Sequence, residues 1–380
     1  MNILLVTEFF PSGKGLRFSG GVEARTFFIA KFLARKHSIS IIASRGLKDP
    51  KTEKMYGFTV YRIGPKRDYS VSVGHLISRI IFIRDAIKFG RTFDVEIVDG
   101  GNYISHFIAK NIAVSKKIPC VAWYPDVWLN DWIKNAGMYG LFGEILERVN
   151  LLRGFNSYIA ISNNTANKLK KFTQKNVHVV YCGVDENEFL VNRVKFKEPT
   201  IISVSRLTKY KNIKTVILAF ASLSTKIKNV RLIIVGSGSE ENRLKDLVKE
   251  LKITKRVNFL KNLPRRKLIE LYKMSHVFSL PSTVEGFGIA TIEAGAAGLP
   301  YVNSDAPIHQ EVTKDGFGGY LENSEIPSDF SKRFHELITN ERLYNRKSKQ
   351  AKKLSQIYSW KEISDQTEAI YESTVKKYEY

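Results

Sequence analysis

Short apolar segments alternate with longer amphipathic segments along most of this 380-residue chain, and the alternation restarts once. The apolar segments are rich in β-branched residues and have the length of strands. A first series of predicted strands covers residues 3–6, 39–43, 59–63, 95–98, 120–123, 158–161 and 177–181. A second series covers residues 200–205, 231–235, 257–260, 277–280 and 301–303. Strands that alternate with helices form parallel sheets, so the sequence predicts an α/β protein with two doubly wound, Rossmann-like units.

Residues 185–199 separate the two series of strands; they are polar, show no clear period and end in Pro199. Such a segment is typical of a domain linker. We therefore expect one domain over residues 1–190 and a second over residues 191–357, followed by a helical pattern at about 358–380. Open parallel sheets bind ligands at the carboxyl ends of their strands, which predicts a ligand site in the cleft between the two units.

The chain is strongly basic, with 60 Lys and Arg against 37 Asp and Glu and a net charge of +23. This balance favours anionic partners such as nucleotides, acidic lipid surfaces or nucleic acid, although solubility alone is the plainer explanation. The excess is spread evenly over both halves of the chain. A dedicated nucleic-acid module more often concentrates its charge, so nucleic acid is the minor alternative.

Cysteine usage and hydropathy exclude several other classes of protein. The chain has two cysteines, Cys120 and Cys182, without the spacing of a disulfide framework or a zinc site. Its first residues, MNILLVTEFF, run directly into an expected strand without a basic leader or a cleavage site. No apolar run approaches the roughly 18 residues of a membrane-spanning helix. These observations predict a cytoplasmic protein, with contact to a membrane surface as a further expectation.

Residues 281–300, PSTVEGFGIATIEAGAAGLP, form the strongest local motif. A predicted strand ends at Pro281 and a helix restarts around Gly288, with Glu285 before the restart and Glu293 after it. Glycines let backbone N–H groups approach a ligand closely, and the positive end of the new helix attracts anions. The motif therefore suits a phosphorylated ligand rich in hydroxyl groups.

Within this motif, EGFGIATIE resembles the Glu, seven residues, Glu signature of the family 4 retaining glycosyltransferases, which have the GT-B fold. The resemblance implies two Rossmann-like domains facing a cleft, with the acceptor on the first and the nucleotide sugar on the second. It also implies that the C-terminal helix, which opens with Tyr358-Ser359-Trp360, crosses back onto the first domain. The implied reaction is transfer of a hexose from a UDP- or GDP-sugar to an acceptor hydroxyl with retention, without a metal or a cofactor.

The resemblance also implies roles for four charged residues of the second domain. Arg206 and Lys211, in a loop after the first strand of this domain, would bind the donor diphosphate; a solvated charged loop is the alternative. Glu285 would contact the hydroxyls of the donor sugar. Glu293 is assigned to the nucleotide ribose, because two adjacent hydroxyls can both donate to one carboxylate; a surface glutamate is the alternative.

Backbone groups at three turns are further candidates for binding the donor. The amides of Phe287, Gly288 and Ile289 open the helix of the main motif and would hold phosphate or sugar oxygens. The other two turns are glycine-rich, and in the family the matching glycines lie near the donor. They are Gly20 with Gly21, and Gly236 with Gly238. Each pair can also be an ordinary tight turn.

The first domain departs from the family pattern at PCVAWYPDVW, where Pro125 occupies the position of a common histidine. Asp126 remains and is the candidate to position the acceptor or a sugar hydroxyl; a helix N-cap before Val127 is equally compatible with its place. Asp99, expected just after a strand, and His106 are plausible residues of the cleft, although a lone histidine is more often structural.

The acceptor is less constrained, and a sugar, a lipid-linked or a protein-linked acceptor all fit. Residues 69–93 combine Leu76, Ile80, Ile83 and Ile87 with basic residues. This pattern fits docking on an anionic membrane, or an ordinary helix that covers the first sheet. Two rival functions are a sugar-nucleotide epimerase or hydrolase on the same fold, and a noncatalytic basic protein that binds nucleic acid or a surface.

Overall fold

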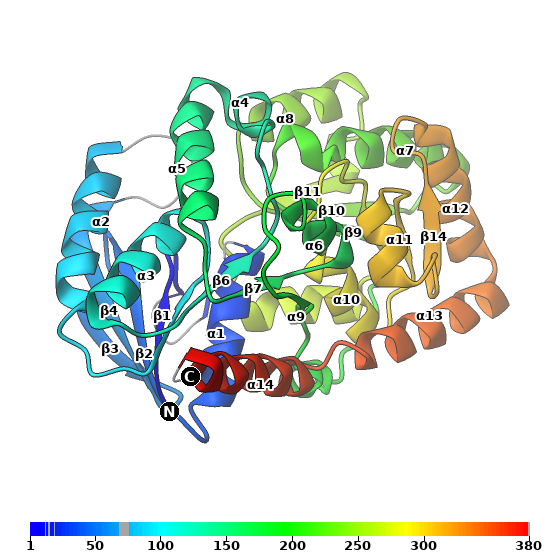
Figure 1. Ribbon diagram of the computed structural model, residues 1–380. Coiled ribbons are helices and arrows are strands. Elements are labelled where there is room, and N and C mark those ends of the chain that lie inside the picture. The colour runs from blue at the N-terminus through cyan, green and yellow to red at the C-terminus, as the bar shows by residue number, and fades with distance from the viewer. Residues whose placement is uncertain (12, 14–15, 19, 68–75, 379–380) are drawn as a thin grey trace. The chain divides into compact units, whose positions relative to one another are not determined.

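The computed structural model describes residues 1–11, 13, 16–18, 20–67 and 76–378. The chain forms two compact units (Figure 1). The first contains Met1–Gly13, Gly21–Tyr181 and Trp360–Tyr380, and the second contains Lys14–Gly20 and Cys182–Ser359. The chain thus passes from one unit to the other after Tyr181, and residues 185–199, the expected linker, belong to the second unit.

The first unit is built on an eight-stranded sheet with the order β3-β4-β2-β1-β5-β6-β7-β8. All neighbouring strands are parallel except β3 and β4, which form an antiparallel pair at one edge. The strands are β1 (Asn2–Val6), β2 (Ser38–Gly46), β3 (Thr52–Met55), β4 (Phe58–Arg67), β5 (Ile97–Gly100), β6 (Cys120–Tyr124), β7 (Ser157–Ala160) and β8 (Val177–Val179).

Helices α2 and α3 pack side by side against this sheet, α5 packs against α3, and α1 packs against α14 (Figure 1). The helices of the unit are α1 (Gly21–Leu33), α2 (Leu76–Gly90), α3 (Tyr103–Lys116), α4 (Trp132–Ala136), the 3₁₀ turn η1 (Gly137–Tyr139), α5 (Gly140–Arg153), α6 (Asn163–Leu169) and α14 (Trp360–Tyr378). Buried aliphatic and aromatic side chains of α2, α3, α5 and α6 form one core with the sheet, and their burial stabilises the unit.

The C-terminal helix α14 belongs to the first unit, as the sequence predicts. The ring of Trp360 stacks on Phe28 of α1 with 5.1 Å between ring centroids, and Ser157 Oγ and Thr374 Oγ1 lie 2.7 Å apart in a hydrogen bond. Tyr371 donates its hydroxyl hydrogen bond to the buried Asp99 carboxylate. Both ends of α14 are therefore attached to the first unit.

The second unit contains a six-stranded sheet of parallel strands with the order β11-β10-β9-β12-β13-β14. Its strands are β9 (Thr200–Val204), β10 (Arg231–Val235), β11 (Val257–Leu260), β12 (Val277–Leu280), β13 (Tyr301–Ser304) and β14 (Gly319–Glu322). Its helices are η2 (Glu186–Phe189), η3 (Lys209–Lys211), α7 (Ile213–Lys226), α8 (Glu241–Glu250), η4 (Thr254–Arg256), α9 (Arg265–Met274), α10 (Ile289–Ala296), α11 (Pro307–Thr313), α12 (Pro327–Thr339) and α13 (Glu341–Gln356). Two doubly wound sheets, parallel except for the β3–β4 pair, confirm the predicted α/β class.

Helix α2 resolves part of the question raised by residues 69–93. Residues 69–75 lie outside the described residues. In the helix itself Phe82 and Ala86 are buried in the core, whereas Leu76, Ile77 and Ile80 are exposed. The later turns are thus an ordinary covering helix, and only the first turns present apolar side chains to solvent. Among the described residues, none of the helices combines the length and the apolar character needed to cross a bilayer.

Candidate functional site

The loops that follow neighbouring strands β10, β9 and β12 meet at the carboxyl edge of the second sheet. Thr283 N donates to Tyr210 O at 2.9 Å, which joins the loop after β12 to the loop after β9. Leu207 N donates to Ser237 O at 2.9 Å, which joins the loop after β9 to that after β10. This is the edge at which doubly wound sheets bind ligands. The main candidate residues of the second unit lie on these loops.

Lys211 and Glu285 form a buried ion pair at this edge, between Lys211 Nζ and Glu285 Oε2. Their side chains are 9% and 15% exposed. Burial alone would raise the pKa of Glu285, but the attraction of Lys211, with smaller contributions from His309 and Arg206, holds that pKa below its ordinary value. The structure thus brings together two predicted residues that are 74 positions apart.

Arg206 lies in the same loop and remains exposed. It donates to Tyr210 Oη at 2.7 Å, and Lys211 Nζ lies 5.4 Å from the centre of the same ring. Tyr210 therefore separates two cations that face the ligand edge. With the Glu285 carboxylate these groups carry one net positive charge, and the two cationic side chains are hydrogen-bond donors that suit a diphosphate.

Gly236 and Gly238 are required by the packing of the loop after β10. Their φ angles are +150° and +159°. A Cβ atom on Gly236 would lie 1.8 Å from Ser205 O, and one on Gly238 would lie 2.3 Å from Leu207 O. These glycines let the loop touch the backbone beside Arg206. This packing explains both glycines without a ligand, so their predicted contact with the donor stays a prediction.

Helix α10 begins at Ile289, close to the predicted restart, with Gly288 as its N-cap at φ +82°. Phe287 is buried, with its ring 5.4 Å from that of Tyr358. A Cβ atom on Gly288 would lie 3.6 Å from both Glu285 Cγ and His309 Nε2. The positive end of α10 is therefore next to the Glu285 side chain, in the arrangement that binds anions.

His309, on α11, is a residue of this site that the sequence analysis does not single out. It is 1% exposed. Its Nδ1 lies 3.0 Å from the carbonyl oxygen of Ser304, which can only accept, so Nδ1 carries the proton. Its Nε2 is buried and has no hydrogen-bond partner in the part of the chain that the structure describes. Burial lowers the pKa of His309, although the Glu285 carboxylate opposes that effect.

Glu293, one helical turn into α10, is buried in a network of polar side chains. Arg265 Nη1 donates to Glu293 Oε1, and Tyr272 Oη donates to Glu293 Oε2 at 3.3 Å. Arg265 also donates to Glu188 Oε2 from Nη2 at 2.8 Å. Glu293 is thus not the exposed helical glutamate that was the alternative. Sequence patterns do not reveal Arg265 and Tyr272, because they lie on another helix.

Asp126 is buried in its own loop, whereas Gly20 and Gly21 are exposed. Asp126 lies in the loop after β6, and its Oδ1 accepts from Val127 N at 2.8 Å and from Lys168 Nζ at 2.7 Å. Its Oδ2 accepts from Trp128 Nε1 at 3.2 Å. This carboxylate holds its own loop, whereas the N-cap position of α4 is Asp131. Gly20 and Gly21 are exposed at the start of α1, and a Cβ atom on Gly20 would have no neighbour within 4 Å among the described residues.

Asp99 and His106 are part of the core of the first unit. Asp99 lies inside β5, not after a strand, and its Oδ2 pairs with Arg25 Nη1 at 2.9 Å. His106 Nε2 lies 2.8 Å from the carbonyl oxygen of Trp123, to which it donates. Burial lowers the pKa of His106 to about 4, so the ring is neutral near pH 7. Both residues are explained by packing and hydrogen bonding.

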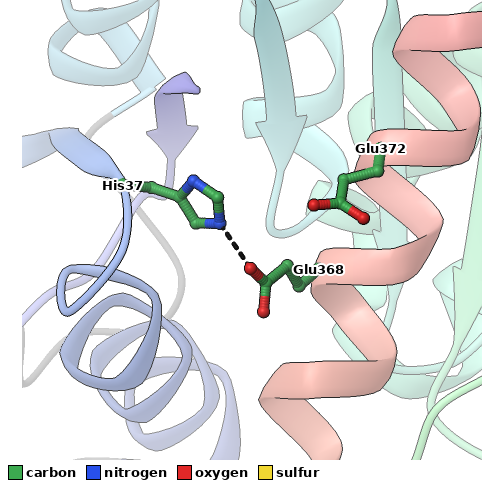
Figure 2. Close-up of side chains that lie close together, drawn as sticks. All are labelled: His37, Glu368 and Glu372. Carbon is green, nitrogen blue, oxygen red and sulfur yellow. Dashed lines mark hydrogen bonds and ion pairs between the residues drawn. The ribbon is translucent and has the colours of Figure 1, made fainter.

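One group of side chains among the described residues has the spacing of metal ligands: His37, Glu368 and Glu372 (Figure 2). Figure 2 shows the His37 ring facing Glu368 of α14, with Glu372 further along the helix. His37 Nε2 lies 2.7 Å from Glu368 Oε1, and Lys36 Nζ donates to Glu368 Oε2 at 2.8 Å. Both oxygens of Glu368 thus already have basic partners, and the group is explained as an ion-pair cluster that attaches α14.

Comparisons with known proteins agree with this geometry. The family described as Glycosyltransferase Family 4 matches residues 19–188, and the family described as Glycosyl transferases group 1 matches residues 184–354. An uncharacterized glycosyltransferase of Methanocaldococcus jannaschii is 25% identical over 405 aligned positions, which cover 98% of both chains.

Two solved structures show the same fold at low sequence identity. Sucrose-phosphate synthase from Thermosynechococcus elongatus has a TM-score of 0.83 at 17% identity, over 98% of both chains. Anabaena HepE in complex with UDP-glucose has a TM-score of 0.77 at 17% identity, over 98% of this chain and 100% of that one. The two family matches together run from residue 19 to residue 354. The chain therefore belongs to the family 4 glycosyltransferases, and its two Rossmann-like units are those of the GT-B fold.

Proposed function

We propose that this glycosyltransferase moves a hexose from a UDP- or GDP-sugar to an acceptor hydroxyl, with retention at the anomeric carbon and without a metal ion. The observation that carries the proposal is the buried Lys211–Glu285 pair beside the N-terminus of α10. It offers a cation for phosphate and a carboxylate for sugar hydroxyls within one small site. The complex of Anabaena HepE with UDP-glucose supports a nucleotide-sugar donor.

The proposed roles divide the donor into three parts. Lys211, Arg206 and the N-terminus of α10 stabilise the negative charge that develops on the departing diphosphate. Glu285 exchanges its contact with Lys211 for contacts with the hydroxyls of the hexose. Glu293 accepts hydrogen bonds from the two ribose hydroxyls. Metal-independent transfer is proposed because these cations and the helix provide the charge that a metal would otherwise supply.

Retention follows if the acceptor oxygen attacks the anomeric carbon on the face that the diphosphate leaves. The bond from the anomeric carbon to the phosphate oxygen breaks, and the bond to the acceptor oxygen forms on the same side. The acceptor proton passes to the departing phosphate oxygen, so the products are the glycoside and a nucleoside diphosphate. No separate strong base is required, and Asp126 is proposed to orient the acceptor from the first unit.

The first test offers the protein a panel of UDP-, GDP- and ADP-sugars. Binding is measured as a shift of the melting temperature, and turnover as release of free nucleoside diphosphate with and without a lipid extract. We expect a shift with a UDP- or GDP-sugar, and release only when the extract supplies an acceptor. Release of nucleoside diphosphate without any acceptor would favour the hydrolase. Conversion of one nucleotide sugar into another, without release of nucleoside diphosphate, would favour the epimerase. No shift with any donor, together with salt-sensitive binding of DNA, would overturn the proposal in favour of the binding protein.

A lipid-linked acceptor and an anionic membrane surface are proposed partners, and exposed apolar side chains support them. In the first unit these are Leu76, Ile77 and Ile80 of α2, with Ile133, Met138, Leu141 and Ile145 of α4, η1 and α5. Ile77 is 75% exposed and Met138 is 86% exposed. Basic Arg84, Lys134 and Arg148 are exposed on the same helices, Lys134 on α4 and the two arginines beside Asp85 and Glu144, and exposed basic side chains favour an acidic bilayer.

Replacing both Ile77 and Met138 by serine is expected to lower binding to vesicles that contain phosphatidylserine by at least about tenfold, because each buried aliphatic side chain contributes roughly 1.5–3 kcal/mol. Leu152→Ser is the matched control, since Leu152 is 87% exposed at the opposite end of α5. Co-sedimentation at low and high salt measures the effect. Equal binding by all three proteins, or no binding to acidic vesicles at low salt, would remove the membrane from the proposal.

A further inference from the structure

The carboxylate of Glu293 is held from two sides by groups of helix α9. Arg265 approaches Oε1 through Nη1, and the hydroxyl of Tyr272 approaches Oε2 at 3.3 Å. Arg265 and Tyr272 are 8% and 0% exposed. Two oxygens of one carboxylate are therefore fixed by two donors that cannot move into solvent. The side-chain plane of Glu293 is set by α9, not by α10, on which Glu293 lies.

Arg265 is itself fixed in place by further contacts. Its Nε and Nη2 atoms donate to Glu188 Oε2 at 3.1 and 2.8 Å. Its backbone N–H donates to Leu16 O at 3.1 Å, and its guanidinium lies 5.9 Å from the centre of the Phe18 ring. Burial raises the pKa of Glu188, and the positive charge of Arg265 opposes this effect. A guanidinium with this many partners can orient another group accurately.

The two donors leave part of the bonding capacity of Glu293 unused. A carboxylate offers about four lone-pair positions on its two oxygens, and Arg265 and Tyr272 each occupy one on a different oxygen. Among the residues that the structure describes, one further position therefore remains on each oxygen. The side chain of Glu293 keeps 9% of its surface accessible. Two neighbouring hydroxyls can each donate to one oxygen of such a carboxylate.

We infer that Arg265 and Tyr272 are positioning residues that orient Glu293 to accept both hydroxyls of a ribose, so that the enzyme selects ribonucleotide donors over 2′-deoxyribonucleotide donors. This inference rests on the proposed function, in which Glu293 contacts the nucleotide ribose. A donor without the 2′-hydroxyl leaves one oxygen of the buried carboxylate without its hydrogen bond, and that loss weakens binding. Without Tyr272 or Arg265 the carboxylate turns, and the 2′-hydroxyl then contributes less.

The test compares the binding of UDP and dUDP, and of GDP and dGDP, to the full chain by calorimetry. We expect the wild type to bind the ribonucleotide roughly tenfold or more tightly than its 2′-deoxy counterpart, as for a hydrogen bond to a charged group. In Tyr272→Phe and Arg265→Lys this ratio should fall several-fold toward one. Both nucleotides should bind the variants more weakly, but ribonucleotide binding should weaken more, because the deoxynucleotide has only its 3′-hydroxyl contact with Glu293 to lose.

Two matched controls separate orientation from simple loss of stability. Tyr301→Phe removes another buried tyrosine hydroxyl, which donates to Phe317 O at 2.8 Å. Arg266→Lys changes the neighbouring arginine, whose side chain is 81% exposed. Both controls should keep the wild-type ratio, whatever they do to the melting temperature.

Three outcomes would overturn the inference, and they have different meanings. If Tyr272→Phe and Arg265→Lys lower the melting temperature but keep the wild-type ratio, both residues only stabilise the fold. If the wild type binds UDP and dUDP equally, and GDP and dGDP equally, Glu293 does not read the ribose, while the proposed transfer stands. If the wild type binds no nucleoside diphosphate, the proposed function fails together with the inference. If Arg265→Lys does not fold, Tyr272→Phe alone decides.

Discussion

Lys211→Ala and Glu285→Ala are each expected to lower kcat for hexose transfer by about 10²–10³, the usual loss for a group that stabilises charge in a transition state. Lys211 loses its contact with the departing diphosphate, and Glu285 loses its hold on the hexose. The unit should stay folded, because its core is formed by other residues. Release of nucleoside diphosphate measures the effect. Lys209→Ala is the control, since Lys209 is exposed two positions earlier in the same loop.

A double variant distinguishes catalysis from a merely structural ion pair. Breaking a buried pair on one side leaves a charge without its partner, and such a variant can lose activity through the fold alone. Lys211→Met combined with Glu285→Gln removes both charges and keeps similar volume. If the pair only stabilises the unit, the double variant regains activity. If the pair binds the donor, the double variant stays as inactive as the single ones, and near wild-type activity would contradict the assignment.

The strands of both sheets were largely predictable because buried parallel strands are nearly continuous apolar runs. β10, β11 and β12 have the predicted bounds. β3 was not predictable in this way, since its sequence TEKM is polar and it pairs only at the antiparallel edge. β14 was missed as well; it is a four-residue strand, GYLE, at the opposite edge of the second sheet. Edge strands have a neighbouring strand on one side only and are less buried, so fewer of their residues are apolar.

The candidate site was predictable where a local motif carried it, and not where packing across the unit created it. Arg206, Lys211 and Glu285 lie in loops after strands, and the resemblance identified them from short segments. The partners of Glu293 are different: Arg265 precedes it by 28 positions and Tyr272 by 21. No periodicity or spacing links such residues before the fold is known. His309 is a similar case, because only the packing of α11 places its imidazole beside Gly288.

Asp99 shows the opposite error of sequence-based prediction: a polar residue near a strand end suggests a ligand contact but belongs to the core. The predicted strand over residues 95–98 is displaced from β5, so that Asp99 lies inside the strand and is 1% exposed. Its carboxylate accepts from Tyr371 of α14 and pairs with Arg25 of α1. Arg25 also lies 4.9 Å from the centre of the Trp123 ring. One carboxylate thus links two helices to the sheet.

Asp99→Asn is therefore expected to lower the free energy of unfolding of the first unit by about 3 kcal/mol, because the buried Arg25 loses the opposite charge of its partner. For a unit of this size the melting temperature should fall by roughly 6–12 °C. Asp85→Asn is the matched control: it makes the same chemical change in an ion pair with Arg84, whose side chain is 75% exposed. That control should stay within about 0.5 kcal/mol of the wild type.

Calorimetry and proteolysis would together locate the effect of Asp99→Asn. Because Tyr371 then donates to a neutral amide oxygen in place of a carboxylate, its hydrogen bond weakens, and α14 should become the segment most readily cleaved at its C-terminal end. Tyr371→Phe should give part of the same effect, since it keeps the Arg25–Asp99 pair and removes only the hydroxyl. If Asp99→Asn and Asp85→Asn had equal melting temperatures, the buried charge pair would add no stability. Apolar contacts, such as the stacking of Trp360 on Phe28, would then hold the C-terminal helix by themselves.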